Sequence, residues 1–258
     1  MAPVAAGLSR PGGIGVSRSA ESILAAWQDW PLPLSAPPKI RESLDTGRTN
    51  RNLRLEVPGL GEDLVLRIHH PDAARLGIDR DRERVITQLT AAADIGRPLW
   101  HWTTDYALFP YIDARVWSAS DVSDPSQRDR LWPLIEQLAA MSIDRPRRRY
   151  SDYLRHYFRQ LEDQDTLSAT LRREWTAFWP ELLAFDEADW SAGLVHHDLV
   201  PSNVLDTDDR LILIDWEYAA MGHRDIDRWT VDPSSIDEPF VAELMTWINR
   251  LWERLVRL

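Results

Sequence analysis

The stretch Leu194-Val-His-His-Asp-Leu-Val-Pro-Ser-Asn-Val-Leu205 has an unusual chemistry that decides how the rest of the chain is interpreted. It places two histidines beside an aspartate, and an asparagine follows five residues after that aspartate. An apolar run, Leu211-Ile-Leu-Ile-Asp-Trp-Glu-Tyr218, comes next and carries a second aspartate. Three kinds of site need to be separated: a metal centre, a histidine-based hydrolase site, and a site that handles phosphate.

The metal and hydrolase interpretations fit this stretch poorly. Neighbouring side chains of an extended segment point in opposite directions, so His196 and His197 are badly placed to bind one ion. The sequence has no cysteine and no pair of histidines at helical spacing that would complete a zinc shell. A serine hydrolase needs an exposed nucleophile of the Gly-x-Ser-x-Gly kind, and the sequence lacks this motif.

The phosphate interpretation fits much better. His196-x-Asp198-Leu-x-x-x-Asn203 has the spacing of a kinase catalytic loop, and Asp215 stands at the end of the next apolar strand. Phosphoryl transfer requires an aspartate that orients the acceptor hydroxyl, and it requires an asparagine and a second carboxylate that hold Mg²⁺ against the phosphates. A loop that returns into a hairpin brings these three side chains into one small volume. Magnesium prefers such oxygen ligands.

The composition limits the class of protein. With 258 residues, 44% hydrophobic and 28% charged, the chain is typical of an ordinary globular protein with a sizeable core. The absence of cysteine excludes disulfides and fits a reducing cytoplasm. No segment has the apolar length of a signal peptide or a membrane span, so we expect neither. A formal net charge of −11 argues against nucleic acid as a partner. It is compatible with a cationic small substrate, although acidity also serves solubility alone.

The first 38 residues are expected to form a leader and a short helix. Residues 1–18 are rich in Gly, Ala, Pro and Ser, which is typical of a loose segment. The glycine cluster at 12–15 follows no expected strand, so it is not interpreted as a phosphate loop. Residues 19–30 have the pattern of a short amphipathic helix before a proline-rich stretch.

Two lobes are predicted beyond the leader, giving an α+β fold with domain ranges 39–113 and 114–258. The first lobe should be a small β-rich unit with one helix, in the order strand, strand, helix, strand, strand: 52–57, 63–68, 79–93, 99–102 and 107–112. The second lobe should be larger and mainly helical, with helices from 124 onward, at 153–161, at 167–185 and at 239–256. Pro180 is expected to interrupt or end the third of these helices.

The motif His-x-Asp-Leu-x-Pro-x-Asn, followed by Leu-Ile-Asp-Trp-Glu-Tyr, resembles the aminoglycoside phosphotransferase and choline kinase superfamily. That family has a protein-kinase-like fold of two lobes. The second half of the motif is more similar to the choline and thiamine kinase branches. The resemblance extends from about residue 45 to residue 229. It includes a short nucleotide loop, the third strand, the start of the following helix and the adenine linker: Gly47-Arg-Thr-Asn-Arg51, Val65-Leu-Arg-Ile68, Gly77-Ile-Asp-Arg-Asp-Arg-Glu83 and Leu108-Phe-Pro-Tyr-Ile112.

The resemblance implies a role for each matching residue. Asp198 would be the catalytic aspartate, and Asn203 and Asp215 would be the Mg²⁺ ligands. The ATP-binding residues would be Thr49 and Asn50 of the loop, Arg67 with its ion-pair partner Glu83, and Phe109, Tyr111 and Ile112 of the linker. His196 and Asp227 would brace the catalytic loop.

The acceptor side is less determined by the sequence. Glu217 and Trp216 stand beside the metal strand, and Trp247 and Trp252 lie on or beside the apolar face of the final helix. These four are candidates for binding a cationic substrate, because tryptophan is the best aromatic face for a cation. The alternatives are a solvated glutamate and ordinary core packing of the tryptophans. His197 would either narrow the acceptor pocket or face solvent.

The resemblance implies an ATP- and Mg²⁺-dependent small-molecule kinase in the cytoplasm. Its acceptor would be the hydroxyl of a cationic or amino-bearing alcohol, with choline-like or thiamine-like compounds placed before aminoglycosides. A catalytically weak, kinase-like nucleotide-binding scaffold is the rival from another class. The sequence leaves open the acceptor, the preference between ATP and GTP, and the oligomeric state.

Overall fold

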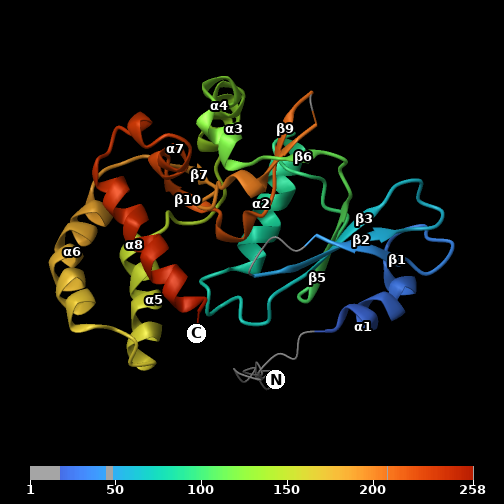
Figure 1. The fold of residues 1–258 in the computed structure, drawn as a ribbon, viewed down its shortest axis with the longest axis horizontal. Helices are drawn as coiled ribbons and strands as arrows, with labels where there is room; N and C mark the ends of the chain where they lie inside the picture. Colours follow the sequence, from blue (N-terminus) through green and yellow to red (C-terminus); the bar gives the residue numbers. More distant parts are fainter. Residues whose placement is uncertain (1–17, 45–48, 208, 258) are drawn as a thin grey trace, which may run out of the picture.

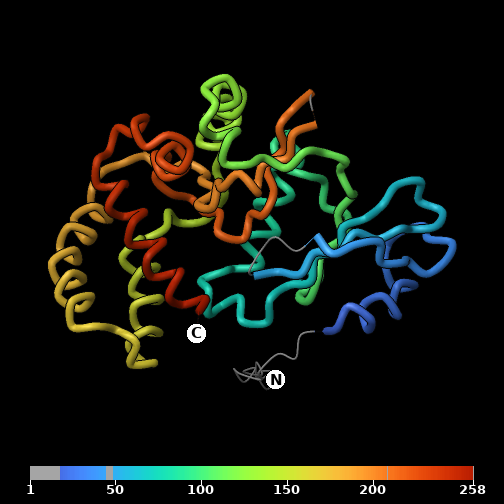
Figure 2. Tube along the Cα trace, viewed as in Figure 1, coloured from blue at the N-terminus to red at the C-terminus, as the bar shows by residue number. Residues whose placement is uncertain are grey.

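The computed structural model describes residues 18–44, 49–207 and 209–257, so the glycine cluster at 12–15 and Gly47 of the expected nucleotide loop lie outside the described residues. The chain forms a β-rich N-terminal lobe and a larger, mainly helical C-terminal lobe (Figure 1). Residues 111–114 carry the chain from one lobe to the other (Figure 2). The α+β fold expected from the sequence is confirmed.

The N-terminal lobe contains a five-stranded antiparallel sheet in the order β1-β2-β3-β5-β4. Its strands are β1 (Lys39–Ser43), β2 (Arg51–Glu56), β3 (Leu64–Ile68), β4 (His101–Trp102) and β5 (Tyr106–Pro110). The hairpin predicted from the alternating pattern is the pair β2–β3, with Leu53 opposite Leu66. The edge strand β1 was not predicted, because its sequence KIRES has little apolar alternation and every residue of it is exposed.

The two faces of β3 contact different parts of the protein, because successive side chains of a strand point to opposite faces. Leu64, Leu66 and Ile68 pack into an apolar cluster that also contains Ile23 of α1 (Ala20–Ala25). Helix α1, with the short 3₁₀ turn η1 (Trp27–Asp29) after it, therefore covers the outer face of this sheet. The other face of β3, which carries Arg67, looks toward the C-terminal lobe.

Helix α2 (Arg80–Ala92) lies between the sheet and the helical lobe (Figure 1). Its N-cap is Asp79, whose side chain accepts a hydrogen bond from the Arg82 N–H, as expected for an aspartate at this position. The fully buried Ile86 packs with Leu194 and Trp216 of the C-terminal lobe. The helix is thus fixed to the lobe that carries the motif stretch.

The C-terminal lobe contains six helices among the described residues. They are α3 (Ala119–Ser123), α4 (Pro125–Ala139), α5 (Tyr150–Asp163), α6 (Ala169–Glu187), α7 (Asp225–Val231) and α8 (Phe240–Leu255). No helix in the described ranges is both long and apolar enough to cross a membrane. Helix α4 starts at Pro125 after the cap Asp124, as the sequence predicts.

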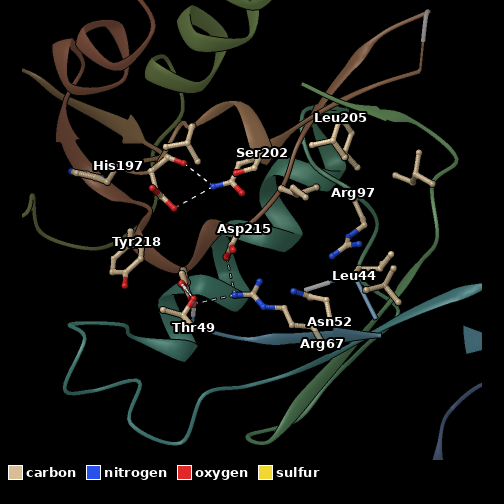
Figure 3. Close-up of a pocket in the computed structure, with 18 of the residues that line it drawn as sticks. Leu44, Thr49, Asn52, Arg67, Arg97, His197, Ser202, Leu205, Asp215 and Tyr218 are labelled. Atoms are coloured by element: carbon tan, nitrogen blue, oxygen red, sulfur yellow. Dashed lines mark hydrogen bonds and ion pairs between the residues drawn. The ribbon is translucent and has the colours of Figure 1, made fainter. Parts of the chain in front are cut away.

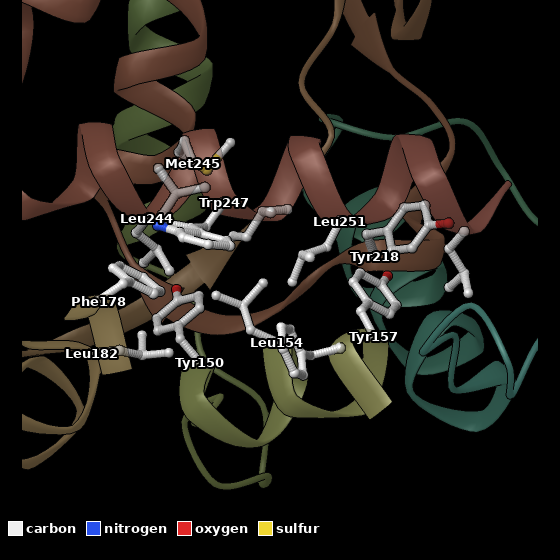
Figure 4. Packing of buried hydrophobic residues seen from close by; sticks show 14 of the residues in the cluster. Tyr150, Leu154, Tyr157, Phe178, Leu182, Tyr218, Leu244, Met245, Trp247 and Leu251 are labelled. Atoms are coloured by element: carbon white, nitrogen blue, oxygen red, sulfur yellow. The ribbon is translucent and has the colours of Figure 1, made fainter. Parts of the chain in front are cut away.

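The expectation that Pro180 interrupts or ends a helix is wrong. Helix α6 runs through Pro180 to Glu187. Proline costs one backbone hydrogen bond and crowds the preceding turn. Phe178 and Leu182, on either side of the proline, are buried in the core shown in Figure 4, and their packing holds the helix together.

Helix α8 closes this core against α5 and α6 (Figure 4). The ring of Trp247 stacks on Phe178, with 5.0 Å between ring centroids and 19° between planes. Leu154, Leu244 and Leu251 are fully buried in the same cluster. This packing fixes the last helix along one side of the interlobe region.

Short strands in the C-terminal lobe hold the motif stretch. A two-stranded sheet pairs β7 (Ala192–Val195) with β10 (Ala220–His223), and a three-stranded sheet has the order β6 (Arg115–Val116), β8 (Val204–Asp206), β9 (Leu211–Leu213). The segments between them form the 3₁₀ turns η2 (Pro201–Asn203) and η3 (Trp216–Tyr218), and η4 (Pro233–Ser235) follows α7. The catalytic-loop motif therefore leaves one small sheet and enters the other.

Because residue 193 is glycine, strand β7 can lie very close to the C-terminal end of α4. A Cβ atom on this residue would lie 2.1 Å from the carbonyl oxygen of Ala139. Because that neighbour is backbone, we expect Gly193→Ala to reduce the free energy of unfolding by about 1–3 kcal/mol. Urea denaturation measures the change.

The matched control is Ala192→Gly on the same strand. It creates no overlap, so it should cost only the backbone entropy of glycine, about 0.5–1 kcal/mol. A Gly193→Ala protein as stable as the wild type would contradict the close approach of β7 and α4.

Candidate active site

A cavity of about 610 Å³ lies between the lobes (Figure 3). The N-terminal lobe contributes lining residues from β1, β2, β3 and the linker, and the C-terminal lobe contributes the motif stretch, the segment after β9, and α8. The lining residues discussed below are Leu44, Thr49, Asn52, Val65, Arg67, Arg97, Tyr111, Ile112, Tyr153, His197, Asp198, Asn203, Leu205, Ile214, Asp215, Glu217, Tyr218, Asn249, Trp252 and Glu253. The cavity therefore contains residues of both expected half-sites, nucleotide and acceptor.

The catalytic loop begins at two backbone N–H groups that share one carboxylate. The N–H of His196 donates to Asp227 Oδ2 at 2.7 Å, and the N–H of His197 donates to Asp227 Oδ1 at 3.0 Å. The ring of His196 also lies 2.9 Å, through Nε2, from the carbonyl oxygen of Ile214. Burial raises the pKa of Asp227 to about 7, while the two backbone N–H groups lower it. These contacts fit the bracing role expected for His196 and Asp227.

Two residues of the site have left-handed backbones. His197 has φ 64° and Asp215 has φ 68°, a region that non-glycine residues rarely adopt. Such strain persists only where the surroundings fix the conformation, and it is common at functional sites. At Asp215 the bend turns the chain from β9 into η3 and directs its carboxylate into the cavity (Figure 3).

The ring of His197 is held by partners that the sequence did not indicate. Its Nδ1 donates to the carbonyl oxygen of Val195 at 3.1 Å, so Nε2 accepts from the Tyr150 hydroxyl at 3.1 Å. That hydroxyl in turn accepts the His223 N–H at 3.0 Å. Burial holds the pKa of His197 well below its usual value, so the ring is neutral. Gly222 makes room for this arrangement, because a Cβ there would lie 2.6 Å from the Tyr150 hydroxyl oxygen.

Asp198 and Asn203 are in direct contact. The Asn203 amide nitrogen donates to the Asp198 carbonyl oxygen at 2.8 Å and to its carboxylate at 3.2 Å. Both amide hydrogens are directed at Asp198, so the amide oxygen of Asn203 is left to bind another group. Burial, reinforced by Asp215 and Glu217, raises the pKa of Asp198 well above its usual value. A carboxylate in this environment is a stronger proton acceptor than one in water.

Arg67 lies opposite this pair and contacts three carboxylates. Its Nη2 is 2.8 Å from Glu83, 2.9 Å from Asp215 and 3.3 Å from Glu217. Burial alone would lower the pKa of Arg67, but the three carboxylates raise it above its usual value. The side chain of Glu83 is fully buried, so the expected ion pair between Arg67 and Glu83 exists in a dry environment.

Asn203 and Asp215 offer a donor set that fits Mg²⁺. Arg67 occupies only Oδ1 of Asp215, whose side chain is 27% exposed to the cavity. The other carboxylate oxygen and the amide oxygen of Asn203 are the hard oxygen ligands that Mg²⁺ prefers, and phosphate and water oxygens would complete its shell. The residues present therefore fit the ion that the family resemblance implies.

Glu217 joins the two lobes. Its carboxylate accepts from Thr49 Oγ1 at 2.6 Å and from Asn50 Nδ2 at 2.8 Å, and it lies 3.4 Å from Arg80 Nη1. Burial and Asp215 raise the pKa of Glu217 to about 7, against the lowering effect of Arg67 and Arg80. The sequence placed Thr49 and Asn50 at the nucleotide and Glu217 at the acceptor, whereas the structure brings all three together.

Arg80 is a member of this group that the sequence analysis missed. It contacts Glu83 at 2.6 Å and Asn50 Oδ1 at 2.9 Å. Its position three residues before Glu83 on a helix was a usable signal, because residues at that spacing are neighbours. We call Thr49, Asn50, Arg67, Arg80, Glu83 and Glu217 the interlobe cluster.

The linker residues are not equivalent. The Tyr111 N–H donates to the carbonyl oxygen of Asp63 at 2.8 Å, so it cannot also donate to a nucleotide. Backbone groups alternate along a strand, which directs the Pro110 carbonyl and the Ile112 N–H to the opposite edge. Tyr111 and Ile112 line the cavity, while Phe109 lies behind it as part of the sheet.

Of the three tryptophans considered for the acceptor, Trp252 lines the cavity. Its indole N–H donates to the Tyr218 hydroxyl at 2.9 Å. Trp216 is buried against the ring of His196, 4.6 Å away between centroids, and Trp247 is in the α8 core. The structure therefore gives no support to a substrate contact by Trp216 or Trp247.

The model of the phosphotransferase enzyme family, APH, matches residues 41–255 of this chain. The chain belongs to this phosphotransferase family. It is thus an enzyme of the phosphotransferase class, and the resemblance inferred from the motif stretch is confirmed. The match covers both lobes and every residue of the cavity lining.

Solved structures of low sequence identity share the fold. The choline kinase LicA from Streptococcus pneumoniae has a TM-score of 0.66 at 17% identity, over 84% of this chain and 86% of that chain. A structure of LicA in complex with AMP reaches 0.72 at 16% identity, over 92% and 90%. A thermostable mutant of aminoglycoside phosphotransferase APH(4)-Ia scores 0.60 at 17%, over 86% and 89%. No match was found among curated protein sequences.

Glu217→Ala would leave the donors of Thr49, Asn50 and Arg80 without their shared acceptor. Removing one partner of a buried charged group is strongly destabilising, so we expect a loss of about 3 kcal/mol in the free energy of unfolding. Chemical denaturation measures this change. Glu253→Ala, at an exposed glutamate of α8, is the control and should cost about 0.5 kcal/mol or less. Equal effects of the two substitutions would show that the interlobe cluster contributes no stability.

Proposed function

We propose that this phosphotransferase is an ATP- and Mg²⁺-dependent kinase that phosphorylates the hydroxyl of a small cationic or amino-bearing alcohol. The observation that carries the proposal is the convergence of Asp198, Asn203 and Asp215 on one wall of the cavity, opposite Arg67. A proton acceptor, two oxygen donors for a metal and a cation for phosphate are the parts that phosphoryl transfer requires.

The donor nucleotide has a fitting site at the linker end of the cavity. Leu44 and Val65 from the N-terminal lobe and Leu205 and Ile214 from the C-terminal lobe supply two apolar walls for a purine ring. The Ile112 N–H and the neighbouring carbonyl at 110 are the free backbone groups for its polar edge. The fold shared with an AMP complex supports nucleotide binding.

The chemistry follows from what each residue does to charge. Asp198 accepts a hydrogen bond from the acceptor hydroxyl and receives its proton as the oxygen attacks the terminal phosphorus. The bond between that phosphorus and the bridging oxygen breaks, and ADP is the leaving group. Arg67 opposes the negative charge of the phosphate oxygens. A bound Mg²⁺ between Asn203 and Asp215 would neutralise further phosphate charge and would lower the energy of the transition state.

The acceptor end of the cavity favours a small cation. Tyr153, Tyr218 and Trp252 present aromatic groups, and Glu253 and Asn249 of α8 add polar ones. Each contact between a cation and an aromatic face contributes about 0.5–2 kcal/mol. A choline-like or thiamine-like alcohol fits such a surface. Of the two glutamates of α8, Glu253 lines the cavity and Glu243 does not, and an aminoglycoside would need more carboxylates than this.

A weakly active nucleotide-binding scaffold is the rival proposal, and the complete set of Asp198, Asn203 and Asp215 argues against it. A cytoplasmic location, which the absence of cysteine permits, stays a prediction, as does the absence of nucleic-acid partners. Turnover of ATP with and without a panel of alcohols separates the kinase from the scaffold.

Asp198→Asn keeps the size of the side chain and removes its ability to accept a proton. Because a positioned base contributes about 10²–10⁴-fold, kcat should fall by that factor while ATP affinity changes little. Steady-state kinetics and nucleotide titration give the two numbers. If ATP affinity fell as much as kcat, Asp198 would have a structural role instead.

The acceptor ranking can be tested directly. Under saturating Mg·ATP, kcat/KM for choline, ethanolamine or thiamine should exceed that for kanamycin, because the acceptor end is aromatic and carries few carboxylates. Mass spectrometry of the products confirms which hydroxyl is phosphorylated. Efficient phosphorylation of kanamycin with all three small alcohols inert would reverse the ranking.

A further inference from the structure

Arg97 stands at the inner end of the cavity on a rigid piece of backbone. The preceding residues are pinned on both sides: the Gly96 N–H donates to the Thr90 carbonyl at 2.9 Å, and the Leu213 N–H donates to the Ile95 carbonyl at 2.8 Å. Figure 3 shows the Arg97 guanidinium pointing into the cavity, away from Leu205 and toward the side of Leu44 and Asn52. Neither the sequence pattern nor the family resemblance assigns this residue a role.

The charge of Arg97 has no partner in the described part of the chain. No carboxylate oxygen of a described residue lies within 4.0 Å of it, whereas Arg67 contacts three carboxylates. The guanidinium lies over the ring of Phe109, whose centroid is 4.0 Å from the guanidinium carbon. Burial and repulsion from Arg67 lower the pKa of Arg97 to about 9, and Asp215 only partly opposes them. Arginine stays protonated in proteins, so the lowered pKa indicates a positive charge that no nearby carboxylate balances.

Packing alone does not explain a cation at this position. A contact between a cation and an aromatic face is weak next to the desolvation of an unpaired charge. An apolar side chain of similar length would cover Phe109 without that cost. The guanidinium is therefore suited to bind an anionic ligand inside the cavity.

The neighbours of Arg97 indicate which anion this is. Among the described residues, two arginines line the cavity; Arg67 is already balanced by Glu83, Asp215 and Glu217, and Arg97 is not. We propose that Arg97 is a second phosphate-binding residue of the donor site and contacts the phosphate chain of the nucleotide beside Arg67. This inference rests on the proposed function. Guanidinium groups bind phosphate through two parallel hydrogen bonds, which a fixed backbone favours.

The experiment compares wild-type protein with Arg97→Met by calorimetric titration of Mg·ADP and of adenosine. Loss of a hydrogen bond to a charged group should weaken Mg·ADP binding by about ten- to a hundredfold. Adenosine has no phosphate, so its affinity should not change. The unfolding temperature without ligand should stay equal or rise, because an uncompensated cation has been removed.

Arg84→Met is the matched control, because this residue of α2 lies outside the cavity lining and its hydrogen bond among the described residues is to Gln88. It should leave both affinities at the wild-type value. Arg97→Lys tests charge alone, and partial recovery of Mg·ADP binding relative to Arg97→Met is expected.

Three results would overturn the inference. Mg·ADP affinity could be unchanged in Arg97→Met, adenosine could lose as much affinity as Mg·ADP, or the variant could unfold at a clearly lower temperature. The last would show that Arg97 stabilises the fold itself. If the protein did not bind nucleotides at all, wild-type protein would bind neither ligand. If it bound nucleotides without transferring phosphate, the titrations would still test Arg97, and only the turnover assay with alcohols would fail.

Discussion

The structure depends on one buried carboxylate of the C-terminal lobe that accepts hydrogen bonds from the N-terminal lobe. Glu217 belongs to η3, the turn that follows β9, and its donors Thr49 and Asn50 come from the segment before β2. Its other neighbours, Arg67 and Arg80, are paired with the fully buried Glu83 of α2. A carboxylate in a dry interior is costly unless its lone pairs are used. Their use brings the sheet, α2 and the turn after β9 together, and the cavity lies between these elements.

The C-terminal lobe supplies the rigidity that the polar groups need. Trp247 and Phe178 anchor α8, so its cavity-facing residue Trp252 is presented from a packed helix. Asp227 fixes the start of the catalytic loop through two backbone N–H groups. Asp215 is held in a left-handed backbone that few residues adopt. Apolar packing thus stabilises this lobe, whereas the backbone strain lies at residues proposed to perform the chemistry.

The sequence predicted those features whose chemistry depends on spacing along the chain. Asp198 and Asn203 are five residues apart and meet within one loop, so their contact follows from the motif alone. Features made by residues far apart were not accessible in this way. The hydrogen bond between Tyr150 and His197, the bridge from Arg80 to Glu217, and the unpaired Arg97 arise only when separate elements pack. Pro180 failed as a helix terminator because burial on both sides of it outweighed local preference.

The contact between Glu217 and the segment before β2 has a consequence for how ligands influence each other. Thr49 and Asn50 belong to the stretch predicted to cover the nucleotide, while Glu217 is two residues from Asp215, the proposed metal ligand. If two ligands each bind more tightly when the two lobes are close together, the binding of one must increase the affinity for the other. By thermodynamic reciprocity, the factor is the same in both directions. An acceptor that touches both the N-terminal lobe and the segment around Glu217 would thus raise the affinity for the nucleotide without contacting it.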